Sequence, residues 1–407
     1  MATAQRFDVG GVLLERPFKI RRLGHFGINL SRMAEGLEFY RNMLGFRVTD
    51  IRDPFAGREM PDAFKGLGDP RGYFTRYGSD HHAFVINNHR VRLLRDRDGK
   101  TREGVTIGQI TWQVQSLREV MDGHRWLAAE GCNMVRVGRD MPGSNWHTYL
   151  MDPDWHQNEL YYGIEQVGWS GHSKPWDMHD REFREAPELP QISEYREVED
   201  ALARGVDLMS GYRDTEDWPA TFDVDGILMP RPFKIVRIGP VGLFAEDVDA
   251  MAAFYTDKLG FVVSEESAFE DARCLFLRCS TEHHSLALYP MALREVLGFS
   301  EHSTLMSFGL QLANYRQLKA AVAFLEDKGV KVRELDAALF PGMGKTAIAF
   351  DPDGHAMVLY HEMEQVGWDG RVRPAAARRR LKPGEWPETI DGAGDSFMGE
   401  PFLGPWA

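Results

Sequence analysis

The sequence predicts an α+β protein built from four strand–helix–strand–strand–strand (βαβββ) modules, which pair into two tandem domains with curved, barrel-like mixed sheets. Three observations support this prediction. The chain of 407 residues is too long for one ordinary core and suits two domains. Several short motifs occur twice in the same order. Within each copy, segments with strand-like and helix-like spacing of apolar residues follow one another in a pattern that itself repeats.

The duplication is visible as pairs of matching motifs. They are Arg16–Ile20 with Arg231–Ile235, Phe39–Tyr40 with Phe254–Tyr255, Leu44–Phe46 with Leu259–Phe261, Asp152–Asp154 with Asp351–Asp353, and Glu165–Trp169 with Glu364–Trp368. The first copy also contains a longer loop, Asp53–Arg71, that the second copy lacks. Because the two copies can be compared position by position, residues kept in both are expected to serve the fold. Polar residues present in only one copy are candidates for chemistry.

The motifs place the first domain at residues 15–170 and the second at residues 230–370. Residues 171–229 form an interdomain segment rich in Trp, His and acidic residues, and residues 371–407 form a C-terminal tail. We expect the extra loop and the interdomain segment to shape the mouth of a pocket, since loops on a rigid scaffold commonly carry specificity. Trp176 and His179 are weaker candidates for capping that opening.

The elements of the first domain follow from periodicity. The first module is expected to contain a strand, a helix closed by Gly45 as C-cap, and three short strands: Ile20–Leu30, Met33–Met43, Phe46–Asp50, Tyr73–Tyr77 and Ala83–Asn87. The second module repeats this order: Ile107–Gln113, helix Leu117–Ala129, Asn133–Val137, Trp146–Met151 and Glu159–Tyr162. One such module cannot bury its sheet face alone, so two must pair into a curved sheet with helices outside.

Composition and charge exclude several classes of function. Apolar residues make up 43% of the chain, charged residues 27%, and the formal net charge is −13, which favours neither nucleic acid nor a membrane surface as partner. Three cysteines cannot form a disulfide framework, and neither a membrane span nor a signal pattern is present. The basic run Arg378–Arg380 is expected to be a solvated turn. These features predict a soluble, cytoplasmic protein.

An asymmetry appears when the copies are compared position by position. His25, in the first strand, corresponds to Pro240, and Glu159, in the last strand, corresponds to Val358. A carboxylate inside a strand is costly to bury without a partner, and a cation is the natural one. The comparison therefore predicts a metal-bearing first domain and a degenerate second domain without metal ligands.

Three motifs of the first domain occur together in one known family. They are Leu23–His25, the helix end Phe39–Phe46, and Asp152–Asp154 followed by Glu159. With the module layout, they resemble the vicinal oxygen chelate superfamily, which includes extradiol ring-cleaving dioxygenases, glyoxalase I and epimerases. The two-domain length most resembles the type I extradiol dioxygenases. In those enzymes the C-terminal half is catalytic, whereas here the metal candidate is the N-terminal half.

The resemblance implies a set of metal ligands. His25 and Glu159 occupy two ligand positions, and Gln109 occupies the third, where extradiol enzymes have a second histidine. Relatives of the glyoxalase and epimerase type accept glutamine as a ligand, although an amide oxygen is a neutral and weaker donor. In those relatives the strand after His82 supplies a ligand too. If His82 bound the metal, it would restore two histidines and a carboxylate, with Gln109 as a fourth donor.

The resemblance also implies catalytic roles next to the metal. His82, the second residue of the pair His81–His82, matches a histidine that acts as acid and base in extradiol dioxygenases. The second copy keeps a similar pair, His283–His284, so a structural role is also open. Tyr149 matches a tyrosine that hydrogen-bonds the substrate oxygen. His147, two residues away on the same strand face, is expected to bind substrate.

The leading hypothesis is a metal-dependent extradiol-type dioxygenase that cleaves a catechol-like or other hydroxylated aromatic substrate with O2. Fe(II) is the expected metal and Mn(II) the second choice. One alternative is a non-oxidative isomerase, epimerase or lyase of the glyoxalase type that uses Co, Ni or Zn. Another is a metal-free protein that binds a small aromatic. The chain is expected to form a homo-oligomer, since relatives usually associate.

Overall fold

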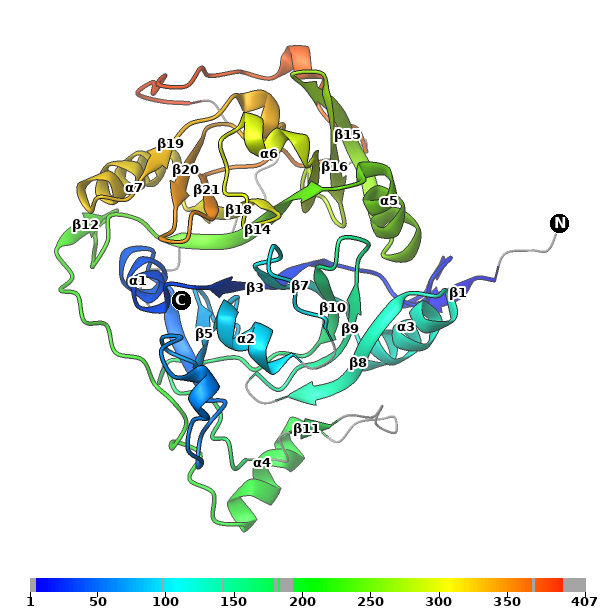
Figure 1. Cartoon of the computed structure of the whole chain (residues 1–407), viewed down its shortest axis with the longest axis vertical. Coiled ribbons are helices and arrows are strands. Elements are labelled where there is room, and N and C mark those ends of the chain that lie inside the picture. Colours follow the sequence, from blue (N-terminus) through cyan, green and yellow to red (C-terminus); the bar gives the residue numbers. More distant parts are fainter. Residues whose placement is uncertain are drawn as a thin grey trace.

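The computed structural model describes residues 5–96, 99–140, 143–178, 182–183, 193–367 and 370–390. Two mixed β-sheets lie one above the other, one from each sequence copy (Figure 1). Both sheets are open at their edges, and the predicted fold class is confirmed. No helix in the described part of the chain has the length and apolar character needed to cross a membrane.

The first sheet has nine strands among the described residues. In spatial order they are β11 (Glu182–Phe183), β8 (Asn133–Asp140), β9 (Trp146–Met151), β10 (Gln157–Tyr162), β7 (Ile107–Gln113), β3 (Arg22–Leu30), β6 (Phe84–Asn88), β5 (Gly72–Arg76) and β4 (Arg47–Arg52). Strand β3 runs parallel to β6 and antiparallel to β7, so the two predicted modules join at β3 and β7. Strand β11 comes from the interdomain segment, which therefore extends the first sheet.

The second sheet has eight strands in the described ranges. Their order is β15 (Val262–Phe269), β16 (Ala272–Arg278), β17 (Leu286–Pro290), β14 (Ile235–Ala245), β18 (Leu305–Leu312), β21 (Ala356–Tyr360), β20 (Thr346–Phe350) and β19 (Val332–Arg333). A small hairpin precedes each sheet: β1 (Phe7–Val9) with β2 (Val12–Leu14), and β12 (Phe222–Val224) with β13 (Ile227–Met229). The repeat therefore begins before the Arg-Pro-Phe-Lys-Ile motif.

The helix predicted in each module is present, and three further helices were not predicted. The helices of the first copy and the interdomain segment are α1 (Met33–Leu37), α2 (His89–Arg95), α3 (Leu117–Ala129) and α4 (Glu194–Ala203), and those of the second copy are α5 (Val248–Ala253), α6 (Ala292–Val296) and α7 (Tyr315–Asp327). Helices α1 and α5 each continue as a π-helix, Glu38–Met43 and Phe254–Lys258. Short 3-10 turns lie at Asp62–Phe64, Ala337–Leu339 and Ala375–Ala377. The domain boundaries predicted from the repeats stay a prediction.

Two of the repeated motifs join the domains reciprocally. The hydroxyl of Tyr40 donates to Asp351 Oδ2 at 2.9 Å, and the hydroxyl of Tyr255 donates to Asp152 Oδ2 at 3.0 Å. All four residues are buried at the boundary between the two copies. The tyrosine of each Phe-Tyr motif thus binds the first aspartate of the other copy's Asp-Pro-Asp motif. This contact explains why both motifs occur twice.

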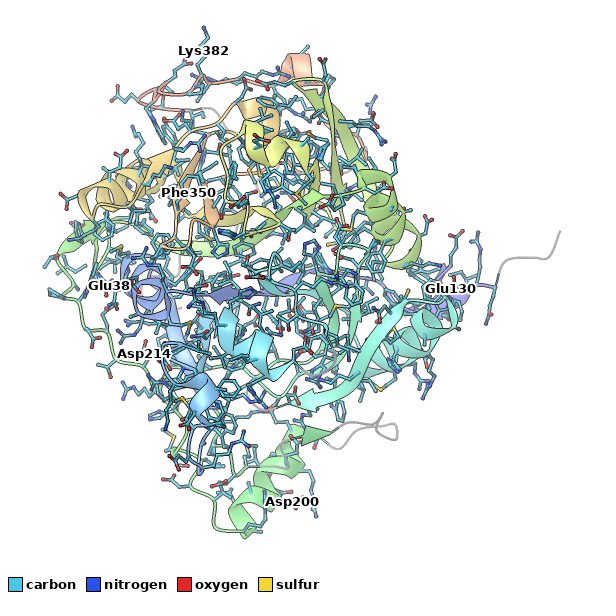
Figure 2. The ribbon with its side chains drawn as sticks, viewed as in Figure 1. Glu38, Glu130, Asp200, Asp214, Phe350 and Lys382 are labelled. Atoms are coloured by element: carbon cyan, nitrogen blue, oxygen red, sulfur yellow. The ribbon has the colours of Figure 1, made fainter. Side chains whose placement is uncertain are left out.

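Histidines four residues after each aspartate extend this interface. His156 contacts Asp152 through Nδ1 at 2.9 Å and Thr304 of the second domain through Nε2 at 2.8 Å. His355 makes the equivalent contacts with Asp351 and with Thr106 of the first domain. At the edge of the interface, Lys258 pairs with Glu130, which Figure 2 labels where α3 approaches the second domain.

The interdomain segment lies along the first domain (Figure 1). Glu197 of α4 binds both terminal nitrogens of the buried Arg139 on β8, at 2.6 and 3.1 Å. Asp214, labelled in Figure 2, pairs with Arg41 at 2.9 Å and accepts the backbone N–H of Val48 on edge strand β4. The segment therefore covers one edge of the first sheet and fixes its position.

The expectation of a solvated turn at Arg378–Arg380 is wrong for Arg378. Its guanidinium pairs with Glu265 and, at 3.0 Å, with Glu364, and its side chain is largely buried. It also contacts His283 Nε2 at 3.1 Å. The sequence run looked like a surface turn because its acidic partners are far away in the chain.

The reciprocal interface predicts a measurable loss of stability on removal of one hydroxyl. Tyr255→Phe leaves two buried acceptors, Asp152 Oδ2 and Asn158 Oδ1, without that donor. We expect the free energy of unfolding to fall by about 1–3 kcal/mol in chemical denaturation. Tyr195→Phe, at a side chain that is 72% exposed, is the control and should change it by less than about 0.5 kcal/mol. Equal effects of the two substitutions would contradict this role.

Candidate active site

Sheet register brings the predicted metal ligands together. His25 on β3 lies opposite Thr111 on β7, and Thr111 lies beside Glu159 on β10. Glu159 in turn pairs with Tyr149 on β9. These four residues form one row across four neighbouring strands. Because side chains in such a row project from the same face of a sheet, residues far apart in the sequence meet at one place.

Glu159 is the centre of this row and is completely buried. Its Oε2 lies 3.2 Å from His25 Nε2 and accepts a hydrogen bond from Thr111 Oγ1 at 3.0 Å. Its Oε1 accepts from Asn145 Nδ2 at 2.8 Å. Burial acts to raise the pKa of Glu159, but His25, His147 and Thr111 outweigh it and hold that pKa below its usual value. The carboxylate is thus kept ionised inside the protein.

The donors around Glu159 suit a divalent metal ion. Two ligands that bind one octahedral ion at about 2.1 Å lie about 3.0 Å apart, close to the 3.2 Å between His25 Nε2 and Glu159 Oε2. The side-chain amide of Gln109 lies 3.3 Å from the same Oε2. Amide oxygen and nitrogen exchange on a flip, so Gln109 can present its carbonyl oxygen there. His25 Nδ1 is buried and has no hydrogen-bond partner among the described residues.

His82 lies next to His25 on the cavity wall. Within the described ranges, no group of three or more His, Cys, Asp or Glu side chains is arranged to hold a metal ion. The rings of His25 and His82 instead meet edge to face, with centroids 4.3 Å apart. The geometry therefore places His82 beside the candidate ligands His25, Gln109 and Glu159, as a neighbour of His25.

A chain of side chains orients His82. Asp50 on β4 contacts His81 Nε2 at 2.9 Å, and the Nδ1 atoms of His81 and His82 lie 2.9 Å apart. If His81 donates its Nε2–H to the carboxylate, its Nδ1 accepts from His82 Nδ1, and His82 Nε2 keeps a lone pair. Burial, with the neighbouring His25 and His81, lowers the pKa of His82 well below its ordinary value. Position 143 has room only for glycine, because a Cβ atom added to Gly143 would lie 2.7 Å from the His82 ring.

Trp176 supports this chain and does not cap the cavity. Its indole Nε1 donates to Asp50 Oδ1 at 2.9 Å, so the interdomain segment reaches the histidine pair through the carboxylate. Trp176 is not among the residues that line the cavity. His179, the other residue considered for capping, lies outside the described residues.

Tyr149 and His147 project from β9 toward the same site. Their rings lie 4.6 Å apart, and the Arg136 guanidinium sits over the Tyr149 ring at 4.8 Å. Burial, followed by the charge of Glu159, raises the pKa of Tyr149 well above its ordinary value, so its hydroxyl stays a donor. Both ring nitrogens of His147 already have protein partners, Asn145 O at 3.1 Å and Arg136 Nη1 at 2.7 Å. His147 can therefore offer a ligand mainly its ring surface.

A cavity of about 310 Å³ opens onto these residues. The sequence-predicted residues on its wall are His25, His82, Gln109, His147 and Tyr149. Pro54 and Pro70, from the two ends of the loop that only the first copy contains, also line it, as expected, whereas no described residue of the interdomain segment does. Glu159 is not among the lining residues, but it contacts three of them, His25, Gln109 and Asn145.

The corresponding place in the second domain is filled by a core. Ile348 and Val358, which replace Tyr149 and Glu159, are completely or almost completely buried. They belong to an apolar cluster that also contains Phe244, Cys274, Phe276, Tyr289, Leu293, Leu297, Met306, Leu339 and Phe340. His283 and His284 keep the contact between their Nδ1 atoms, at 3.0 Å, and His284 packs edge to face on Phe276 as His82 does on Phe74. The histidine pair is therefore arranged alike in both copies, and His82 in addition lines the cavity of the first domain.

Several residues of the site were not predicted. Thr111 follows Gln109 by two positions on β7, so strand alternation could have placed both on one face. Arg136 reaches the site from within β8, where it pairs with Tyr149 of β9. Asn145 reaches it from the turn after β8, and Arg92 from helix α2. No local pattern marks Asn145 and Arg92, because packing of the turn and the helix on the sheet decides their positions.

Comparisons of the sequence with known proteins identify a family and a relative. The model of the Glyoxalase/Bleomycin resistance protein/Dioxygenase superfamily matches residues 22–160 and 237–359. Metapyrocatechase 2 from Cupriavidus necator is 28% identical over 134 residues, a match that spans 33% of this chain and 33% of the relative. Because the match covers one third of each protein, it does not establish the activity of the relative for this chain.

Solved structures share the architecture. A catechol 2,3-dioxygenase aligns with a TM-score of 0.54 at 17% identity, covering 92% of this chain and 97% of its own. The 2,3-dioxygenase LapB from Pseudomonas sp. KL28 aligns at 0.53 and 18%, covering 86% and 95%. An Mn(II)-bound glyoxalase from Novosphingobium aromaticivorans aligns at 0.52 and 16%, covering 86% and 85%. At these identities the likeness concerns the fold.

Metal analysis tests the ligand set. We expect the purified protein, reconstituted with Fe(II) or Mn(II) and desalted, to retain about one ion per chain. His25→Ala or Glu159→Gln should each lower this stoichiometry at least tenfold, because each removes one strong donor. His302→Ala, at an exposed histidine of the second domain, is the control. Unchanged metal content in both site variants, with the fold intact by circular dichroism, would rule the ligand set out.

Proposed function

The chain belongs to the Glyoxalase/Bleomycin resistance protein/Dioxygenase superfamily, and we propose that it is a metal-dependent extradiol-type dioxygenase. Its substrate would be a catechol-like or other hydroxylated aromatic compound, cleaved with O2. The observation that carries this proposal is the arrangement of His25, Gln109 and Glu159 beside His82 and Tyr149 at one cavity. The likeness to catechol dioxygenases of the same two-sheet architecture supports it.

His25, Gln109 and Glu159 would hold the ion, with Fe(II) as the first candidate and Mn(II) as the second. When bound, the metal would bring the substrate oxygens and O2 together at one centre, which turns a bimolecular encounter into a directed reaction. A set of only three protein ligands leaves coordination positions for substrate. Thr111 and Asn145 fix the carboxylate that carries the negative charge of the set.

The remaining residues act on protons and orientation. His82 would take a proton from a substrate hydroxyl at Nε2 and later return it to the oxygen that leaves. The Asp50–His81 contact would hold the tautomer in which this nitrogen is free. Tyr149 would donate its hydroxyl proton in a hydrogen bond to the substrate oxygen as negative charge develops there. The histidine and tyrosine rings on the wall would exclude water around the ring of the substrate.

A second candidate follows from Gln109. An amide at the third ligand position gives a more weakly donating set than two histidines and a carboxylate. Such a set also suits a non-oxidative isomerase, epimerase or lyase with Co, Ni or Zn, in which the metal polarises a carbonyl group. The Mn(II)-bound glyoxalase among the similar structures favours keeping this candidate.

Oxygen consumption separates the two candidates. The protein is reconstituted anaerobically with Fe(II) or Mn(II), mixed with a panel of catechols, and monitored with an oxygen electrode and by absorbance of the ring-opened product. We expect stoichiometric O2 uptake with loss of the aromatic spectrum. Oxygen-independent turnover with Co, Ni or Zn would support the second candidate. Metal loading without O2 uptake across the panel would overturn the dioxygenase proposal.

A matched pair of variants isolates the role of His82. His82→Gln and His284→Gln remove the same member of the two histidine pairs, one beside the cavity and the other inside the second domain's core. We expect His82→Gln to lower kcat by about 10²–10⁴-fold. We expect His284→Gln to leave kcat of the folded protein within about twofold, whatever it does to stability. Equal kcat values for the two variants would assign His82 a purely structural role.

A further inference from the structure

The cavity is positively charged although the protein is acidic. Four arginines and one aspartate line it: Arg52, Arg92, Arg95, Arg136 and Asp140. The whole chain, by contrast, has a formal net charge of −13. A cleft lined by one sign of charge concentrates ions of the opposite sign. The catechol ring alone gives no reason for this excess of guanidinium groups.

Two of these arginines are not neutralised by a carboxylate contact. Arg136 already pairs with Asp140 and contacts His147. Arg92, in contrast, makes one weak hydrogen bond, to Asn29 Oδ1 at 3.3 Å, and no ion pair with a described residue. The side chain of Arg95 forms neither a hydrogen bond nor an ion pair within the described part of the chain. Burial lowers the pKa of both guanidinium groups, and at Arg92 the charge of Asp96 partly opposes that shift.

Helix α2 aims these two arginines at the same place. Arg92 and Arg95 are three residues apart, so they share one face of the helix. The helix starts at Asn88, whose side chain accepts the N–H of Val91 at 3.1 Å. The amide nitrogen of Asn88 also donates to backbone oxygens of Leu67 and Asp69, at 2.7 and 3.0 Å.

These contacts tie the helix to the loop Asp53–Arg71, which only the first copy contains. In the equivalent helix of the second copy, α6, Arg294 takes the place of Arg92 and donates to the backbone oxygen of Ser303 at 3.4 Å. Leu297 takes the place of Arg95 and belongs to the apolar core. Of the two arginines, only Arg95 is therefore specific to the domain that has the cavity.

Arg92 and Arg95 line the same cavity as His25, Gln109 and Tyr149. Arg95 is the more exposed of the two arginines. A substrate bound in this cavity would therefore share it with both guanidinium groups.

We propose that the substrate carries a carboxylate group on its hydroxylated ring and that Arg92 and Arg95 bind this group. The proposal rests on the proposed function and specifies its substrate class. A guanidinium fork matches a carboxylate in shape and charge, and a ligand anion would compensate charges that the protein leaves unpaired there. At about 310 Å³ the cavity is at the small end of ligand pockets, which favours a single ring.

Binding under anaerobic conditions tests this proposal without requiring turnover. The metal-loaded protein is titrated by calorimetry with 3,4-dihydroxybenzoate and with 4-methylcatechol, which share the diol and differ in charge. We expect the carboxylate to bind at least about tenfold more tightly, with a preference that decreases as salt rises. Equal affinities for the two compounds, tighter binding of the uncharged one, or binding of neither would overturn the proposal.

Arginine variants locate the preference. Arg95→Gln and Arg92→Lys should each weaken binding of 3,4-dihydroxybenzoate about ten- to hundredfold and change binding of 4-methylcatechol less than about twofold. Arg125→Gln, at a largely exposed arginine on α3, is the matched control and should change neither. Equal weakening of both compounds by the site variants would overturn the assignment to these arginines.

The two proposals fail in different ways. If the protein prefers the carboxylate and this preference depends on Arg92 and Arg95, but no O2 is consumed, the proposed anion site stands and the proposed dioxygenase activity is overturned. If O2 is consumed with uncharged catechols and the carboxylate is not preferred, the proposed dioxygenase activity stands and the proposed anion site is overturned. A preference for a phosphate- or sulfonate-bearing ring over the carboxylate would overturn the carboxylate assignment.

Discussion

The face-to-face docking of the two sheets is the constraint on which the site depends. On β3, β7 and β10, residues that contact the other domain alternate with residues of the site. Phe26 stacks on Phe308, Trp112 packs on Phe261, and Asn158 accepts the Tyr255 hydroxyl. Their neighbours in sequence are His25, Thr111 and Glu159. Because successive strand residues face opposite sides, fixing the interface also fixes the direction of the candidate metal ligands.

The duplication therefore has two different consequences for the two copies. The interface needs both, and the reciprocal Tyr40–Asp351 and Tyr255–Asp152 contacts keep the same motifs in each. The face of each sheet that points away from the domain interface can be covered either by a packed apolar core or by a ligand. In the second domain it is closed by apolar side chains around Ile348, which supplies hydrophobic stabilisation. In the first domain it stays polar and partly open, so folding tolerates a buried carboxylate that its neighbours satisfy.

Much of this arrangement was predictable from sequence, because periodicity and the repeat are local signals. Strands Ile107–Gln113 and Trp146–Met151 and helix Leu117–Ala129 were predicted with their observed limits. His25, Gln109 and Glu159 converge because strand order follows from the module. Arg92 and Asp50 were missed, since their roles depend on how α2 and β4 pack against distant segments. Arg378 was misread for the same reason.

Anomalous diffraction from crystals grown with Mn(II) tests the central claim, that the chemistry belongs to one copy, most directly. We expect a single strong peak in the chain, about 2.1–2.3 Å from His25, Glu159 and the Gln109 amide oxygen. The second domain should contain no peak near Pro240 and Val358. A peak in the second domain, or no peak between His25 and Glu159 at saturating Mn(II), would contradict it.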